Sequence, residues 1–299
     1  MSRRRWIAPY LFLLPAGVLF LTFLAIPIVY ALFLSVRGTE IADIGPFGTR
    51  RETWIGLSNY AEALTDTEFL LGFVRLLAYG LIAIPLTLGL ALLFALLLDL
   101  PRVRFATFSR IAIFIPYAVP GVIASLLWGF LYLPSTSPLN WLLGILDLPA
   151  VEMLAGTSLY PSVANIAIWS GVGFNMIIIY TSLRGIPEEI YEAARLDGAS
   201  ERAISWRLKI PMVAPALVLT GLFSLIGTLQ LYGEPTTLRP MTNEVSQTWV
   251  PLMTIYRDAF ARDDIWLGAA SSVLLALGTL VLSLILLRAT QRGAVGESS

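Results

Sequence analysis

The side chains that could do chemistry in this chain are few, and most of them gather in one short segment. The 299 residues contain no cysteine and no histidine, which excludes disulfides, thiolate chemistry, the commonest metal ligands and imidazole acid–base catalysis. No phosphate-binding loop of the form G-x-x-x-x-G-K-[ST] occurs either, so the chain itself is not expected to hydrolyse ATP. The short segment carries both signs of charge and can form charge-assisted hydrogen bonds with a partner. Its ten charged residues are Arg184, Glu188, Glu189, Glu192, Arg195, Asp197, Glu201, Arg202, Arg207 and Lys209.

The rest of the chain has the composition of a membrane protein. Hydrophobic residues make up 57% and charged residues 13% of the sequence, whereas soluble domains average about 25% charged residues. The apolar residues come in blocks as long as a bilayer requires. We therefore predict an all-α integral membrane protein with six transmembrane helices in one domain, residues 9–288. The spans are expected at Pro9–Val36, Phe69–Leu98, Thr107–Leu133, Tyr160–Leu183, Met212–Tyr232 and Ile265–Leu287.

The basic residues predict which side of the membrane each loop faces, because loops rich in Arg and Lys stay in the cytoplasm. Thirteen of the twenty fall before the first span, after the last, and in two connections between spans. Residues 1–8, residues 289–299 and the charged segment are therefore expected to be cytoplasmic. These thirteen are Arg3, Arg4, Arg5, Arg102, Arg104, Arg110, Arg184, Arg195, Arg202, Arg207, Lys209, Arg288 and Arg292.

The charged segment has the sequence signals of two short helices joined by a turn. Pro187, followed by two acids, suits a helix start, and Gly198 suits a stop because glycine tolerates the left-handed conformation. Ser200 can cap a second helix, which Pro211 would close. We call residues 186–211 the elbow. These features alone leave two readings equally open, an elbow that docks on another protein and a solvated charged loop.

The elbow also resembles a known motif. Its residues Ile186–Ser200, IPEEIYEAARLDGAS, strongly resemble the EAA loop of ABC-importer permeases, in particular the carbohydrate subfamily of the maltose-permease type. The resemblance extends to WIGLSNYAEALTDTEF, LQLYGEPTTL and IYRDAF, which look like parts of the first outward loop and of the fifth and sixth spans. The chain departs from the family at Ser205, where an aromatic is usual. It also lacks the large outward insertion of the enterobacterial maltose permease.

This resemblance implies a role and a set of partners. The chain would be one permease subunit of an importer in a bacterial inner membrane, beside a second permease subunit. The elbow would couple it to two separate ATP-binding subunits, which would use ATP and Mg, while this chain would bind no cofactor or metal. An extracytoplasmic solute-binding protein would dock on the outward loops, residues 38–68, 134–159 and 233–264. The expected coupling residues are Glu192, Ala193, Ala194, Arg195, Asp197, Gly198 and Ala199.

The substrate path is predicted from neutral polar and aromatic residues at helical spacing in spans three to five. Hydroxyls, amides and aromatic faces without charge suit a neutral sugar or polyol. Asn175 and Gln230 stand out, because a bulky amide in hydrocarbon needs a partner. Helix packing stays open as the alternative role of each small or hydroxylated residue. The candidates are Ser125, Trp128, Trp169, Ser170, Asn175, Ser224, Thr228, Gln230 and Tyr232.

A secondary transporter or channel for a small polar solute is the alternative class. Ion-coupled carriers usually place an ionisable residue near mid-membrane, whereas Arg75, Asp99 and Arg184 fall near the ends of predicted spans. The sequence shows no convincing internal repeat of the kind found in such carriers. A membrane enzyme lacks a catalytic constellation here, and a net charge of zero offers no footprint for nucleic acid. An adjacent ATPase gene would favour the importer, and an isolated gene the carrier.

The basic residues generate a test of topology. Reporter tags at the N-terminus and directly after Gly198 should both read cytoplasmic, and a tag between Ser135 and Pro138 should read external, because basic loops are retained inside. The measurement is reporter activity in whole cells. Opposite sidedness of the two cytoplasmic tags would contradict the arrangement of six spans.

Overall fold

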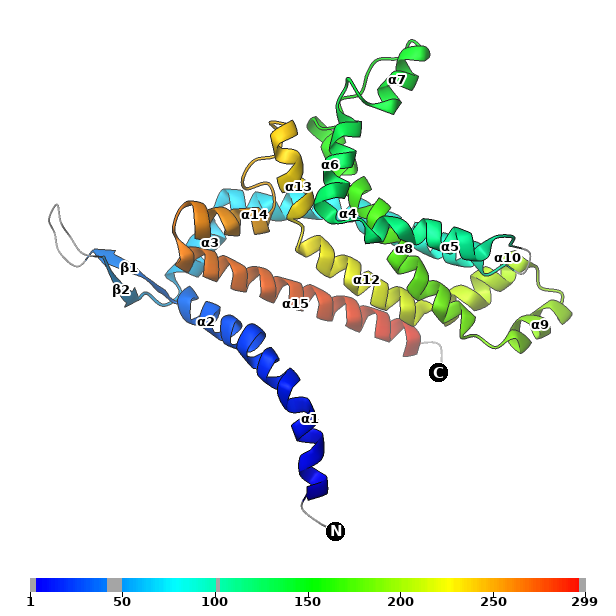
Figure 1. Ribbon diagram of the computed structural model, residues 1–299, viewed down its shortest axis with the longest axis horizontal. Coiled ribbons are helices and arrows are strands. Elements are labelled where there is room, and N and C mark those ends of the chain that lie inside the picture. The colour runs from blue at the N-terminus through cyan, green and yellow to red at the C-terminus, as the bar shows by residue number, and fades with distance from the viewer. Residues whose placement is uncertain (1–3, 42–49, 101–102, 296–299) are drawn as a thin grey trace. The chain divides into compact units, whose positions relative to one another are not determined.

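The computed structural model describes residues 4–41, 50–100 and 103–295, and nearly all of its regular structure is helical (Figure 1). Arg3 and Arg102, which contributed to the predicted orientation, lie outside the described residues. The α-helices are α1 Arg4–Phe20, α2 Ile26–Ser35, α3 Ser58–Thr65, α4 Thr67–Leu98, α5 Ala106–Phe114, α6 Gly121–Tyr132, α7 Pro138–Ile145, α8 Leu159–Arg184, α9 Glu188–Leu196, α10 Glu201–Ile204, α11 Ile210–Met212, α12 Ala214–Leu229, α13 Gly233–Leu238, α14 Pro251–Tyr256 and α15 Ile265–Val295. The 3-10 helices are η2 Ile115–Ala118, η3 Gly156–Ser158 and η5 Arg239–Met241, and the π-helices are η1 Leu21–Ala25, η4 Ser205–Lys209 and η6 Arg257–Ala261.

Among the described residues, four helical segments are long and apolar enough to cross a membrane, at Tyr10–Ser35, Thr67–Leu98, Gly156–Arg184 and Ile265–Arg288. Two further candidates are bent pairs of helices, and the number of candidate spans rises to six if each pair is one span. The pair α5–η2 and α6 is bent by 95° and the pair ending in α12 by 64°. The predicted third span, Thr107–Leu133, is therefore not one straight helix.

The sharp bend in this third segment follows from its two prolines. Pro116 lies in the first turn of η2, and Pro120 is the N-cap residue of α6, with Val119 extended between them. Proline cannot donate a backbone hydrogen bond, and it disfavours a helical conformation in the residue before it. Proline is tolerated in a long helix elsewhere, as Pro85 shows inside α4.

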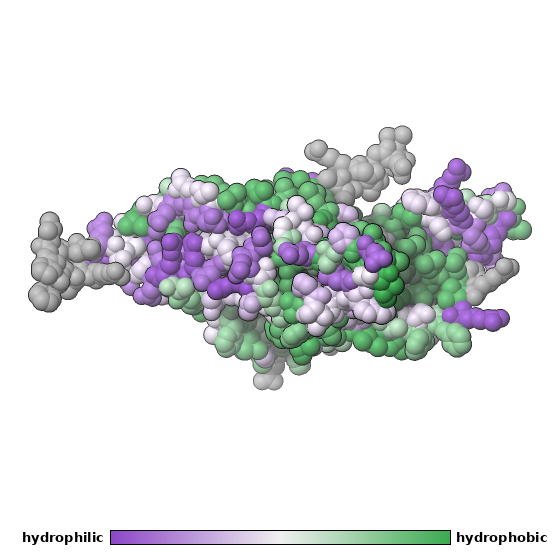
Figure 2. Space-filling view, turned by 90° about the horizontal axis from the view of Figure 1, so that it is seen from above, coloured by the Kyte–Doolittle hydropathy of each residue, from purple (hydrophilic) through white to green (hydrophobic). Residues whose placement is uncertain are grey.

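Many apolar side chains lie on the surface, and Figure 2 shows broad hydrophobic surfaces beside hydrophilic ones. The segment Tyr10–Ser35 is the extreme case, since none of its most apolar 18-residue window is buried within the chain. Phe12 is 86% exposed and Phe23 70%. A soluble protein could not leave such surfaces uncovered, so they indicate contact with lipid tails or with another membrane subunit.

The helices and strands fall into two compact units, residues 1–70 with 254–278 (unit 1) and residues 71–253 with 279–299 (unit 2). Unit 1 contains the one element in the described part of the chain that departs from the all-helical prediction. Strands β1 Arg37–Ile41 and β2 Arg50–Trp54 pair antiparallel, with Arg37 opposite Trp54. Asn59 fastens this hairpin to the end of α2, because its side-chain amide donates to the carbonyls of Ser35 and Arg37.

Unit 2 is built around α8, which packs against α5, η2, α6 and α12. One hydrophobic cluster includes Val163 and Ile166, in the first half of α8, and a second includes Met176 and Ile179, in its second half. Gly173 lies between them, where α8 meets the end of α5. A Cβ atom at Gly173 would lie 2.3 Å from the carbonyl oxygen of Ile113 and 2.7 Å from the Cα atom of Phe114. Only glycine allows this backbone approach.

This close approach predicts a specific loss of stability. Replacing Gly173 by alanine should lower the free energy of unfolding by about 1–3 kcal/mol, because backbone atoms must move apart to admit the methyl group. Gly221→Ala in α12 is the matched control, since its Cβ would meet the side chain of Leu88 at an ordinary 3.7 Å. Thermal unfolding in detergent measures both. Equal melting temperatures for Gly173→Ala and wild type would contradict the packing described here.

Candidate functional site

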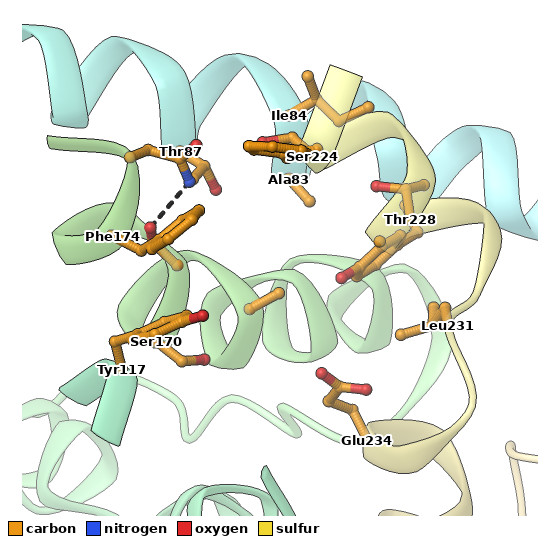
Figure 3. Close-up of a pocket in the computed structure, with 16 residues that line it drawn as sticks. Ala83, Ile84, Thr87, Tyr117, Ser170, Phe174, Ser224, Thr228, Leu231 and Glu234 are labelled. Atoms are coloured by element: carbon orange, nitrogen blue, oxygen red, sulfur yellow. Dashed lines mark hydrogen bonds between the residues drawn. The ribbon is translucent and has the colours of Figure 1, made fainter. Parts of the chain in front are cut away.

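A polar cavity of about 380 Å³ lies within unit 2 and is lined by α4, η2, α8, α12 and the start of α13 (Figure 3). The bent third segment contributes Tyr117, and the end of α12 with the following turn brings in Leu231 and Glu234. The other lining residues are Tyr79, Ala83, Ile84, Thr87, Ala167, Ser170, Gly171, Phe174, Asn175, Phe223, Ser224, Gly227 and Thr228.

Two polar groups give the cavity unused hydrogen-bonding capacity. Asn175 donates from Nδ2 to the carbonyl of Gly171 at 2.8 Å, while its Oδ1 atom is buried and has no hydrogen-bond partner among the described residues. Figure 3 shows the carboxylate of Glu234 turned toward the cavity, and this residue has no ion-pair partner in the part of the chain that the structure describes. Burial raises the pKa of the Glu234 carboxyl. The Asn175 amide oxygen thus has spare hydrogen-bonding capacity beside the cavity, and the Glu234 carboxyl faces into it.

An aromatic row forms part of the cavity wall. The rings of Tyr117 and Phe174 stack with centroids 4.8 Å apart and an interplanar angle of 16°. Phe174 in turn lies 6.2 Å from Phe223 of α12. The row places flat, weakly polar faces beside the hydroxyls of Ser170 and Ser224. This combination suits a molecule with apolar C–H faces and a polar edge.

The cavity brings together four of the nine residues predicted for the substrate path, Ser170, Asn175, Ser224 and Thr228. The other five lie elsewhere. Ser125 is fully buried and bonds to the carbonyl of Gly121, as a packing residue would. Gln230 is exposed at the end of α12. Trp128 packs against Trp169 and Tyr132, and Tyr232 packs against the first hydrophobic cluster.

The sequence prediction missed Thr87, Tyr117, Phe174, Phe223 and Glu234. Phe174 and Phe223 directly precede the predicted Asn175 and Ser224, but an aromatic in an apolar block looks like ordinary core. One signal could have pointed to Glu234: it is an acidic residue two positions after the end of the fifth predicted span, and Pro235 follows it.

The elbow has the two predicted helices and the predicted turn. Pro187 is the N-cap residue of α9, and Gly198 adopts a φ of 83°. A Cβ atom added at Gly198 would meet no other atom within 4 Å. The Ser200 hydroxyl accepts a hydrogen bond from the backbone amide of Ala203, which caps α10. The requirement for glycine at residue 198 is therefore one of backbone conformation, not of space.

The prediction that Pro211 closes the second helix is wrong. Helical structure continues from α10 through the π-helix η4 and α11 to Met212, and the break comes at Val213. In η4 the amide of Ile210 bonds to the carbonyl of Ser205, five residues back. This wider turn makes room for the proline ring, which would meet the carbonyl four residues back in a regular helix. The π-helix η1 precedes Ile26-Pro27 in the same way.

Arg195 connects the two arms of the elbow. Its guanidinium donates to Glu201 of α10 at 2.9 Å and to Glu188 of α9 at 3.3 Å. These hydrogen bonds raise the pKa of Arg195. Arg195 is one of the seven predicted coupling residues, and its side chain is therefore engaged in ion pairs within the elbow itself. Glu192, in contrast, is exposed and has no ion-pair partner among the described residues.

Two further features distinguish the outer and inner faces of the elbow. Leu196 is 89% exposed and Trp206 is 65% exposed, so large apolar side chains extend outward beside the charges. Tyr191 faces inward and is 4% exposed, and burial together with the nearby carboxylate of Asp99 raises its pKa to about 12. A solvated loop has no reason to present leucine and tryptophan in this way, whereas a docking surface does.

A protein-family model matches most of this chain. The model of the binding-protein-dependent transport system inner membrane component matches residues 88–292, which include the cavity helices α8 and α12 and the whole elbow. The chain belongs to this family. It is a membrane permease component of an ABC transporter, in which ATP hydrolysis is the work of a separate subunit.

Curated relatives agree with this assignment over nearly the whole chain. The permease is 30% identical to the probable ABC transporter permease protein YurN of Bacillus subtilis, over 98% of this chain and 99% of that one. It is 28% identical to the diacetylchitobiose uptake system permease protein NgcF of Streptomyces coelicolor, over 93% and 84%. It is 27% identical to the sn-glycerol-3-phosphate transport system permease protein UgpA of Salmonella typhimurium, over 96% and 94%.

Solved structures show the same fold. The permease matches a chain of a bacterial ABC transporter that imports the acidic polysaccharide alginate, with a TM-score of 0.78 and 22% identity over 97% of this chain and 96% of that one. A chain of the alginate transporter in complex with its alginate-bound periplasmic protein gives a TM-score of 0.81 at 20% identity, over 98% and 96%. The predicted fold class, a helical membrane permease of the ABC-importer type, is confirmed.

Proposed function

We propose that this permease forms, with a second permease subunit, the membrane path of a binding-protein-dependent importer for a sugar or sugar derivative. The observation that carries the proposal is the cavity, in which the aromatic row faces hydroxyls and a buried amide oxygen without a partner. Sugar rings offer C–H faces that stack on aromatic rings and hydroxyls that both donate and accept hydrogen bonds. The names of two relatives, which refer to diacetylchitobiose and sn-glycerol-3-phosphate, support the same class.

The charge of the cavity favours an uncharged substrate. Glu234 is the one charged residue in the lining, and no basic side chain accompanies it. Without a basic side chain the lining cannot pair with a phosphate or an acid sugar, whereas the Glu234 carboxyl can hydrogen-bond to neutral hydroxyls. This chain is thus suited to a neutral sugar, in contrast to the anions named for the glycerol-phosphate and alginate systems.

The elbow supports a coupling role with the ATP-binding subunits. Its outer face combines the unpaired carboxylate of Glu192 with the exposed Leu196 and Trp206, the apolar and charged groups expected of a docking surface. In the assembled importer, two ATP-binding subunits would use ATP and Mg, both termini and the elbow would be cytoplasmic, and the binding protein would dock on the opposite side.

No group of three or more potential metal-ligating carboxylates occurs among the described residues.

Purification of the native complex tests the proposal directly. A tag on this chain should retrieve a second permease, an ATP-binding subunit and, after mild cross-linking, a solute-binding protein. A thermal-shift screen of that binding protein against neutral sugars, sugar phosphates and uronic acids then identifies the substrate. Stabilisation by neutral sugars is the expected result, and stabilisation only by compounds that are not sugars would overturn the proposed function.

Asn175 is expected to contribute to transport. Asn175→Leu should lower uptake of the sugar found in that screen by about tenfold, because it removes the free amide oxygen and fills part of the cavity, a loss of about 1.4 kcal/mol. Asn165→Leu is the matched control on the same helix, since Asn165 bonds to Tyr132 outside the cavity. Gln230→Leu should have a smaller effect than Asn175→Leu, because Gln230 is exposed and lies outside the cavity lining. Uptake in proteoliposomes measures all three, and full uptake by Asn175→Leu would exclude the residue from the path.

Glu192 and Gly198 are expected to act in coupling. The family resemblance implies that Glu192 meets a basic residue of the ATP-binding subunit. Glu192→Lys should therefore weaken co-purification of that subunit, because it places two positive charges together. Gly198→Val should misdirect α10 at a cost of about 1–2 kcal/mol, because valine strongly disfavours a positive φ. Both variants should still insert in the membrane and should lose the stimulation of ATP hydrolysis by the binding protein. Wild-type stimulation in both would mean that the elbow is a plain loop.

A further inference from the structure

A buried cluster of charges joins the elbow to the cavity helix α4. Asp99 directly follows the last residue of α4, and its side chain is only 3% exposed. Lys209 of η4, the single lysine of the chain, is 2% exposed and places its Nζ atom 2.6 Å from Asp99. Arg184, at the end of α8, lies 3.8 Å from the other carboxylate oxygen. This cluster gathers the ends of three elements that are far apart in the sequence.

Lys209 also contacts α9, the first helix of the elbow. Its ammonium lies 4.8 Å from the centre of the Tyr191 ring, which belongs to α9 and is itself buried. Such a cation–π contact is strongest where water is excluded. Lys209 therefore touches α9 through Tyr191 and α4 through Asp99. If α9 tilted away from α4, it would either lose the Tyr191 contact with Lys209 or pull Lys209 away from Asp99. The second change would leave the buried ammonium without its acid, which is costly.

Both ends of this connection lead to the cavity. Thr87 of α4 lines the cavity twelve residues before Asp99, a distance of about 18 Å along a helix. In the other direction, η4 and α11 lead through the bend at Val213 into α12, which carries Ser224 and Thr228. A helix is stiff along its axis, so the end of α4 and the cavity-lining Thr87 move together.

We propose that Asp99 and Lys209 are positioning residues that fix the elbow to α4, so that a movement imposed on the elbow reaches the wall of the cavity. The part of this proposal that concerns ATP-driven movement rests on the proposed function. The fixed position of α9 relative to α4 does not, and it can be measured in the permease without any partner. The two parts can therefore fail separately.

The test compares a variant that removes both charges with matched controls. Asp99→Asn alone would leave the buried Lys209 without an acid, and Lys209→Met alone would leave Asp99 only the more distant Arg184. The informative variant is therefore Asp99→Asn with Lys209→Met. Replacing both partners of a buried pair by neutral groups is far better tolerated. Arg104→Met, an exposed arginine in the connection between α4 and α5, controls for the removal of a charge.

The first measurement is the distance between spin labels. Because the chain has no cysteine, Glu189→Cys in α9 and Leu97→Cys in α4 can be labelled without background, and both sites are exposed. The otherwise unaltered permease and Arg104→Met should give one narrow distance distribution. In the double variant we expect a distribution that is broader or shifted, with the yield and melting temperature of the folded permease retained. An unchanged distribution would overturn the proposal.

The second measurement is ATP hydrolysis by the complete importer in proteoliposomes, with and without its native binding protein. The double variant should co-purify with the ATP-binding subunit as wild type does, yet its stimulation should fall at least about fivefold, the lower end of typical coupling between sites. Full stimulation would overturn the role in transmission even if the label distance changes. If Glu192→Lys leaves assembly and stimulation intact, the proposed docking of the elbow fails, whereas the label experiment still decides the fixed position of α9.

Discussion

Hydrocarbon offers no hydrogen-bond partner to a peptide group, so a chain in a bilayer can break its helices only where protein or trapped water covers the break. In this permease the sharpest break, at residues 115–120, packs against α8, and Gly173 of α8 allows the close approach of Ile113 and Phe114 directly before it. The same break turns Tyr117 into the cavity. The irregular backbone and the packing glycine therefore meet one constraint, the need to cover the break. The rest of the cavity wall comes from α4, α8, α12 and the start of α13.

The charged residues of unit 2 also lie mainly where the chain leaves the apolar segments. The cavity holds one carboxylate and otherwise neutral groups, whereas the ion pairs of unit 2 collect at the elbow and at the helix ends that meet it. Exposed pairs there, such as Arg195 of α9 with Glu201 of α10, connect two short helices and contribute little to stability. The buried pair of Asp99 and Lys209 has a different character, because it is shielded from water and salt and holds elements from distant parts of the sequence.

Much of this architecture could be predicted from sequence, and the failures share a physical origin. Local signals were sufficient for the helix start at Pro187, the turn at Gly198 and the cap at Ser200, because each depends on the residue itself and its near neighbours. Pro211 misled the prediction because a π turn, which has no simple local signal, accommodates the ring. The row of Tyr117, Phe174 and Phe223 was missed because it depends on which helices pack against each other. The periodicity of apolar residues predicts which side of a helix is buried, but not which other helix covers it.

The π-helix η4 has a consequence for how such a chain can change in evolution. A π turn holds one residue more than an α turn. Deleting a single residue from Ser205–Lys209 would close this turn to an α turn, in which the ring of Pro211 meets the carbonyl four residues back. Insertions and deletions are harmless in most connections of a membrane protein. Here a deletion would bring the ring of Pro211 against the helix backbone, so the extra residue of η4 is what lets the second helix of the elbow run past the proline toward α12.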